Sequence, residues 1–322
     1  MMENSNRLLA IHIMEILNEH SDAKHTMSQA ELMERLEEKY GDVISRHTCS
    51  DYLKELRQAG YIAGTRGVYR KDLFTERELR TLIDGVMYGK HIPEREAKTL
   101  IEKLRTLSMN SMRGKARNIT YLSSINRTRN DSLYEILDVI DEAIERDLKL
   151  EIIQHSPQID GTRKDWPPRI VDPYFVVSDQ SRYYLLCNAS RDGKLSLEPR
   201  RIDRLTSARA INERRTPLID VVGHDFDLGK YMREHIYMFA GDAGTAEIRI
   251  SNRHIGSFED WHGTDYRVVS AGEDHSVVRV TTNYDALYYW LLQYGSVAEV
   301  MEPAELRNKV KEGLKEILAK YE

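Results

Sequence analysis

Arginine and lysine side chains gather between Ser45 and Lys71, where six basic residues stand against two acidic ones. Six minus two gives this stretch a charge of +4, although the whole chain has a formal net charge of -5. Guanidinium and ammonium groups attract phosphate, and arginine also donates hydrogen bonds to the acceptor edges of nucleobases. Any contact with nucleic acid is therefore expected to be local and to use this stretch.

Histidine and aspartate residues form two short groups whose side chains are of metal-ligand type. The groups are His224, Asp225 and Asp227, and His254, Asp260, His262 and Asp265. Their spacings match no zinc motif such as HExxH, and the sequence has no GxGxxG, P-loop or GxSxG signature. We therefore expect no catalysis, cofactor or metal, and we interpret these histidines as surface or loop residues.

The basic stretch belongs to a series of three expected helices. Residues 7–20 place apolar side chains on one face at helical spacing, which indicates a supporting helix. Ser28 and the glutamate three residues later form a capping box that begins a second helix. Ser45 is a good N-cap for the third, and Gly60 is suited to the left-handed residue that ends it.

The third helix has the character of a recognition helix. Cys49 and Leu53 lie on its apolar stripe, and the N-terminal part of its other face carries polar and basic side chains. Two strand-like pieces joined by residues 64–67 follow, which predicts a hairpin wing with a basic tip. The predicted DNA contacts are Arg46, His47, Ser50, Lys54, Arg57 and Arg66. The alternative is a small packing or protein-interaction domain.

The middle of the chain predicts two helices and a linker. Thr75 with the glutamate three residues later forms another capping box, and Pro93 begins the next helix. Residues 108–130 are polar, basic and weakly periodic, which indicates a solvated linker. Ser132 and the glutamate three residues later predict the cap of a further helix.

Strand patterns dominate the next part. The runs LKLEI, RIVDPYFVV, RYYLLC and LSLEP, with a hairpin turn at Asp192 and Gly193, predict a small, strongly bent sheet or barrel. The last part combines the strands AEIRI and VVRV with the helix DALYYWLLQYG and a final amphipathic helix. That order predicts a compact α+β module.

Residues 169–205 resemble the WYL domain of bacterial transcription regulators. The resemblance lies in an arginine-to-proline strand, in the motif Tyr183, Tyr184 and Leu185, where tyrosine replaces the usual tryptophan, and in an RxDR strand ending at Arg204. The helices after Thr75 resemble the connector of these regulators, and the segment DALYYWLLQYGSVAEVMEPAELRNKV resembles their C-terminal extension. The resemblance covers nearly the whole chain.

The resemblance implies a small Sm/SH3-like β-barrel for the WYL domain and a ligand site on it. The residues it favours for ligand binding are Arg169, Tyr183, Tyr184, Arg201 and Arg204. Guanidinium forks suit phosphate and aromatic rings suit stacking on a base, so we expect a nucleotide or oligonucleotide effector. Alternatively, the tyrosines only alternate between core and surface and the arginines form ion pairs.

Arg201 and Arg204 face opposite sides unless the strand that carries them bends or ends there. One of them could then bind ligand while the other pairs with Asp203 or with a carbonyl group.

Together these patterns predict a multidomain α+β protein with four parts. They are a winged helix-turn-helix at 1–72, a helical connector and linker at 73–130, the WYL ligand-sensing domain at 131–215, and a C-terminal α+β extension for dimerisation or regulation at 216–322.

The expected function is transcription regulation through double-stranded DNA, with repression as the default because no polymerase-contacting segment is evident. The alternative is an RNA-binding or protein-interaction module without operator-specific DNA binding. A homodimer is expected because two recognition helices spaced ~34 Å apart read successive major-groove faces. No apolar run reaches the ~18 residues that indicate a membrane span, and the first residues lack the charged-then-apolar pattern of a secretion signal. We therefore expect a cytoplasmic protein without membrane contact. Cys49 and Cys187 are expected to be packed thiols.

Overall fold

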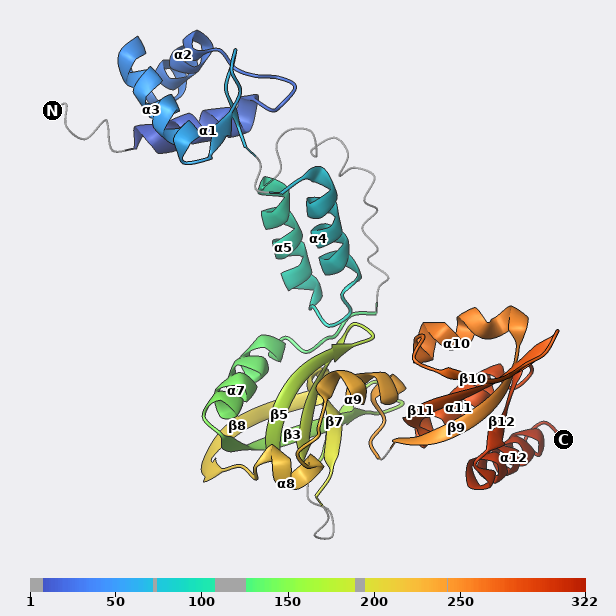
Figure 1. Cartoon of the computed structure of the whole chain (residues 1–322). Coiled ribbons are helices and arrows are strands. Elements are labelled where there is room, and N and C mark those ends of the chain that lie inside the picture. Colours follow the sequence, from blue (N-terminus) through green and yellow to red (C-terminus); the bar gives the residue numbers. More distant parts are fainter. Residues whose placement is uncertain (1–7, 72–73, 108–125, 189–194, 242) are drawn as a thin grey trace. The chain divides into compact units, whose positions relative to one another are not determined.

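The computed structural model describes residues 8–71, 74–107, 126–188, 195–241 and 243–322. Helices and several β-sheets follow one another along the chain (Figure 1), which confirms the expected α+β class. The chain divides into two units, Met1–Thr128 and Arg129–Glu322. Within the described ranges, no helix is long and apolar enough to cross a membrane. The turn expected at Asp192 and Gly193, and most of the expected linker, lie outside these ranges.

The first unit begins with three helices and a short hairpin. They are α1 (Leu9–His20), α2 (Gln29–Tyr40), α3 (Arg46–Gln58), β1 (Ile62–Ala63) and β2 (Tyr69–Arg70). Ser45 Oγ accepts a hydrogen bond from the Thr48 N–H at 3.0 Å, so α3 begins as expected. At α2 only the serine half of the expected capping box forms, because the Glu31 carboxylate accepts from Arg35 at 3.1 Å. Gly60 has a φ of 82° and follows the end of α3.

The core of these elements is formed by one apolar stripe from each helix, with Ile13, Leu36 and Cys49 fully buried. The hairpin is attached to this core by a bridge from the segment before α2. Met27 and Val68 each donate a backbone N–H to the other's carbonyl at 2.8 Å. The bridge fixes the hairpin relative to the helices, because both residues are also buried in the same core.

Two further helices, α4 (Glu76–Tyr88) and α5 (Glu94–Thr106), pack on each other through Leu79, Ile83 and Ile101. Thr75 and Glu78 form the full capping box expected at the start of α4. Arg127, expected in a solvated linker, is instead half-buried at the other end of α4. Its guanidinium donates to the carbonyls of Gly89 at 2.7 Å and Ile92 at 3.2 Å, and also to those of Val86 and Met87. Arginine supplies the donors that the last helical carbonyls lack.

The second unit begins with α7 (Leu133–Glu145) and an antiparallel sheet. Its strands are β3 (Leu148–Pro157), β4 (Arg163–Asp165), β5 (Arg169–Asp179), β6 (Arg182–Asn188), β7 (Leu197–Arg201) and β8 (Leu205–Arg214), in the order β4-β3-β5-β6-β7 with β8 also on β3. The cap expected at Ser132 is wrong, since its side chain makes no cap hydrogen bond. Asn130 Oδ1 accepts the Ser132 N–H instead, at 3.1 Å.

A closed barrel, implied by the resemblance, is not formed by the strand pairings of the described residues. Closure would require β7 to pair with β8, but the chain passes between them through a 3-10 turn, η2 (Ile202–Arg204). Carbonyls at this turn are satisfied by a side chain, because Asn130 Nδ2 donates to Leu205 O at 2.8 Å and to Asp203 O at 3.4 Å. The sheet is therefore open at this edge.

The two faces of this sheet are covered by different helices (Figure 1). Leu185 and Cys187 of β6 pack in the core that includes α7. Leu186 and Tyr184 point to the other face, toward α8 (Leu218–Val222) and α9 (Leu228–Glu234). Because successive strand residues alternate between faces, β6 is apolar on both.

The C-terminal part is a four-stranded antiparallel sheet with helices. Its elements are β9 (Ala243–Ser251), α10 (Ile255–His262), β10 (Arg267–Ala271), β11 (His275–Asn283), α11 (Tyr284–Tyr294), β12 (Ala298–Glu302) and α12 (Ala304–Leu318), with strand order β10-β11-β9-β12. Ile248, Val278 and Trp290 lie in its core. The compact α+β module expected here is confirmed. Cys49 and Cys187 are both buried free thiols.

His262, interpreted from the sequence as a surface or loop residue, is instead buried at the end of α10 in an aromatic part of this core. Its ring stacks on Phe258 with 4.4 Å between centroids and meets Trp290 edge-on at 5.5 Å. Among the described residues neither ring nitrogen has a hydrogen-bond partner. Burial lowers the pKa of His262 to about 4, so the ring is neutral near pH 7.

We predict that His262 makes the protein less stable as the pH falls from about 6.5 to about 4. The unfolded side chain takes up a proton in this range and the folded one does not, so acid favours unfolding, by roughly 3 kcal/mol at the lower end. Urea unfolding at a series of pH values measures the effect. His262→Phe should reduce the acid sensitivity, whereas His254→Phe, at an exposed position, should not. Equal acid sensitivity in all three proteins contradicts the prediction.

Candidate functional site

One side of α3 carries five of the six predicted DNA-contact residues, from Arg46 to Arg57, and all of them are exposed. Their spacing places them on one arc of the helix, beside the buried stripe of Cys49 and Leu53. His47 Nδ1 lies 2.8 Å from Asp51 Oδ2, but both side chains are exposed, so this pair adds little stability. This face of α3 is therefore not packed against other residues of the first unit, and it is predominantly basic.

The sixth predicted residue, Arg66, lies in the exposed turn between β1 and β2. The turn depends on Gly64, whose φ is 103° and whose Cβ, if it had one, would clash with the Gly67 carbonyl oxygen. The bridge from Met27 to Val68 holds the returning strand of the hairpin. Sequence patterns did not predict this bridge, since its two residues are far apart along the chain.

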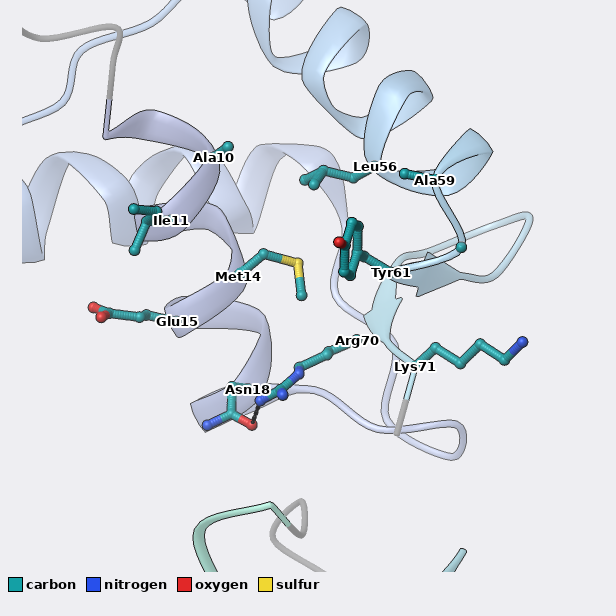
Figure 2. Close-up of a pocket in the computed structure, with 11 residues that line it drawn as sticks. Ala10, Ile11, Met14, Glu15, Asn18, Leu56, Ala59, Tyr61, Arg70 and Lys71 are labelled. Atoms are coloured by element: carbon teal, nitrogen blue, oxygen red, sulfur yellow. Dashed lines mark hydrogen bonds between the residues drawn. The ribbon is translucent and has the colours of Figure 1, made fainter. Parts of the chain in front are cut away.

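A groove of about 800 Å³ lies between α1 and the end of α3 (Figure 2). Met14, Leu56 and Tyr61 supply apolar walls. Figure 2 shows the Arg70 guanidinium hydrogen-bonded to Asn18 Oδ1, while Lys71 extends away from α1. Arg70 thus links the hairpin to α1, a role that a count of basic residues could not distinguish from phosphate contact.

The predicted ligand residues fall into two groups in the WYL-like sheet. Arg169 and Arg204 line a cavity of about 290 Å³. Tyr184 and Arg201 are paired neighbours on β6 and β7, and Tyr184 packs in the cluster with α8 and α9. Tyr183 points the other way and packs against the α7 core. The structure brings Arg169 and Arg204 together in the cavity lining. It leaves Tyr183, Tyr184 and Arg201 outside that lining.

The cavity is lined by nine residues, and none of them is acidic. They are Ile152, Gln154, His155, Ser156, Trp166, Pro167, Arg169, Arg200 and Arg204. Burial and the nearby Arg163 charge lower the pKa of His155, so its ring is neutral at pH 7. The charged groups of the lining are therefore three guanidinium groups, one of which, that of Arg200, is paired with the Glu198 carboxylate at 2.5 Å.

Arg200 is a cavity residue that the sequence prediction missed. It lies on β7 opposite Leu185 and next to Arg201, so the two adjacent arginines point to opposite faces of the sheet. Its guanidinium donates to the Glu198 carboxylate, but its Nε is buried and has no hydrogen-bond partner among the described residues. The alternation of side chains along a strand could have indicated that Arg200 and Arg201 face opposite sides. Only the pairing of β7 with β6 shows which of the two faces the cavity.

Asp203 pairs with two other arginines, Arg182 and Arg201. Its carboxylate accepts hydrogen bonds from Arg201 at 2.9 and 2.6 Å and from Arg182 at 3.0 Å. Although burial opposes it, these bonds and charges lower the pKa of Asp203, and the bonds to Asp203 raise the pKa of Arg201. Burial and the Arg201 charge lower the pKa of Arg204. The strand ends at Arg201, and Arg201 is the arginine that pairs with Asp203.

The histidine and aspartate residues noted in the sequence are not gathered into one cluster among the described residues. In the part of the chain that the structure describes, no three His, Cys, Asp or Glu side chains are arranged to hold an ion. Asp227 instead caps α9, accepting from the Lys230 N–H at 2.5 Å.

Comparison with known families decides the identity of the second unit. The WYL domain model matches residues 135–210, and the WCX domain model matches residues 242–318. This chain contains a WYL domain followed by a WCX domain. The resemblance recognised in the sequence is therefore confirmed, and the C-terminal extension of this WYL-domain protein is a WCX domain. No curated protein matches the chain.

Two solved structures are similar to this WYL-domain protein. Proteasome accessory factor B/C (PafBC) of Arthrobacter aurescens is 16% identical, with 97% of this chain and 54% of that chain covered and a TM-score of 0.31. A CRISPR Cas-related protein is 15% identical, with 89% and 76% covered and a TM-score of 0.39. The chain thus spans about half the length of PafBC.

We predict that Asp203→Ala destabilises the second unit by roughly 3 kcal/mol, because it leaves partly buried arginine charges without their counter-ion. Urea unfolding of the full chain measures this loss. Glu151→Ala is the matched control, since it removes a carboxylate from an exposed pair with Arg209 at 3.0 Å and should change stability by less than about 1 kcal/mol. A similar small loss in both variants argues against the structural role of Asp203.

Proposed function

We propose that this WYL-domain protein is a DNA-binding transcription regulator whose first unit is a winged helix-turn-helix. The observation that carries the proposal is the exposed basic face of α3, with Arg46, His47 and Lys54 turned outward. A helix of this kind docks in the major groove through its N-terminal part. The hairpin between β1 and β2 serves as the wing, and Arg66 in its turn meets phosphate or the minor groove.

The WYL domain is proposed to be the effector sensor. Its cavity combines three guanidinium groups with an aromatic side chain, which suits a nucleotide or nucleic-acid ligand. Effector and operator affect each other if each prefers one arrangement of the protein, since coupling between two binding sites is reciprocal. A homodimer would present two recognition helices to successive turns of the duplex. Repression stays a prediction from the sequence.

We predict that Arg46→Ala and Lys54→Ala each weaken binding to a selected duplex about tenfold, the loss expected for one base or phosphate contact. The duplex is first obtained by selecting bound molecules from a random pool with the wild-type protein. For a residue that contacts phosphate, the slope of log affinity against log salt should also fall by about one unit.

Lys39→Ala is the matched control for these variants. Lys39 lies on α2 and pairs with Glu19 at 2.7 Å, away from the α3 face, so its removal should leave duplex affinity unchanged. If no duplex is enriched from the pool, or if Arg46→Ala and Lys54→Ala bind like wild type, the protein is instead an RNA-binding or protein-interaction module.

A further inference from the structure

Helix α1 has a second surface besides the one buried in the core of the first unit. Ala10, Met14 and Asn18 are spaced by four residues, so they form one row along the helix, outside the buried stripe that contains Ile13. Ile11 lies next to this row and is 52% exposed. An apolar side chain at such a position is unfavourable in water and adds nothing to the core. This surface of α1 is therefore suited to contact with another molecule.

The groove beside α1 extends this surface to the base of the β1–β2 hairpin. Leu56 and Tyr61 line its other wall, and Tyr61 is 58% exposed. Backbone hydrogen bonds fix this wall, since the Tyr61 N–H donates to the Leu56 carbonyl at 2.9 Å and the Lys71 N–H donates to the Tyr61 carbonyl at 2.8 Å. The hydrogen bond from Arg70 to Asn18 joins the two walls. Because the groove is fixed on both sides, a partner can bind it with little loss of conformational entropy.

Opposite charges lie at the two margins of the groove. Figure 2 shows Glu15 extending from α1 at one margin and Lys71 extending from the hairpin at the other, so the two side chains point away from each other. Both residues are exposed. The Glu15 carboxylate accepts a hydrogen bond from the neutral Tyr40 hydroxyl, and no ion pair to Lys71 forms within the part of the chain that the structure describes. Both charges are therefore available to a partner.

A second copy of the groove presents the matching charges in the required order. When two copies face each other across a twofold axis that runs along α1, the two margins of the groove are exchanged between them. Glu15 of one protomer then faces Lys71 of its partner, and the reverse contact forms at the same time. The α1 ridge of each protomer lies over the groove of the other, where it covers Tyr61. A purely acidic or purely basic partner would match only one margin.

We propose that this groove is a contact surface between two copies of the chain, with Glu15 of each protomer paired with Lys71 of its partner. The inference deepens the homodimer of the proposed function, because it assigns a self-association surface to the first unit, and it does not require DNA binding. From the sequence, dimerisation was expected of residues 216–322.

Cross-linking through an introduced cysteine tests the proposal on the full chain. Ala10→Cys places a thiol on the α1 side of the groove, and a short bismaleimide should join two copies, because packed helices lie about 8–10 Å apart. Cys49 and Cys187 are buried and should not react. Glu38→Cys is the matched control, since it introduces an exposed thiol on α2, which contributes no residue to the groove. Absence of a covalent dimer with Ala10→Cys, or equal yields from both positions, overturns the proposal.

Charge exchange distinguishes this contact from other arrangements. In the Ala10→Cys chain, Glu15→Lys alone or Lys71→Glu alone places like charges opposite each other twice. Each should therefore give about tenfold less covalent dimer at the same protein concentration. When the two variant chains are produced together, both attractive pairs are restored, and the two different chains should cross-link with each other. If they cross-link no better than either variant alone, the proposal is wrong.

Further measurements keep the outcomes distinct. Circular dichroism shows whether each variant is folded, and a chain with both Glu15→Lys and Lys71→Glu should regain the cross-linking of the Ala10→Cys parent. Duplex binding is measured on the same preparations. Duplex binding without cross-linking rejects only the contact between copies, whereas cross-linking without duplex binding rejects the regulator and leaves the contact.

Discussion

The carboxylate of Asp203 organises the charged part of the WYL domain. It lies in a 3-10 turn and accepts hydrogen bonds from arginines on two neighbouring strands, Arg182 and Arg201. Without it, these two cations and Arg204 would repel one another at the open edge of the sheet. With it, Arg201 is held on one face while Arg204, one residue past the carboxylate, lines the cavity. One acidic side chain thus pairs with Arg182 and Arg201, whereas Arg204 lies in the cavity lining.

The two faces of this sheet differ in polarity. Toward α8 and α9 it is apolar, with Tyr184 and Leu186 in the packing. The cavity side is polar at its rim, where β3 contributes Gln154 and Ser156. Such a division follows from strand alternation, which sends neighbouring residues to opposite surfaces. Tyr183 and Tyr184 of the family motif therefore pack on opposite faces of the sheet, and the residues that line the cavity come from other elements.

Local signals in the sequence were sufficient for most elements of the first unit. Ser45, Thr75 and Gly60 act through backbone groups only a few residues away, so their roles can be predicted without knowing the fold. Ser132 has the same local pattern but makes no cap, because Asn130 occupies the N–H of that turn and also reaches the η2 carbonyls. A competing contact from a distant part of the chain overrode the local preference.

Contacts between distant segments were the part that sequence patterns could not supply. The attachment of the β1–β2 hairpin through Met27, the position of Arg127 on the end of α4, and the open edge between β7 and β8 all depend on tertiary packing. Arg200 was missed for a related reason. Arg201 beside it belongs to the family motif, and only the strand register reveals which of the two enters the cavity.

The adjacency of Arg200 and Arg201 limits how this part of the chain can evolve. Both belong to β7, which pairs only with β6 among the described strands, so a single ladder sets which arginine points where. Inserting or deleting one residue just before them would exchange the two side chains between faces. The cavity would lose the Arg200 side chain, and Asp203 would lose its partner Arg201 at the same time. Only insertions or deletions of two residues would keep both side chains on their present faces, so the length of β7 is constrained.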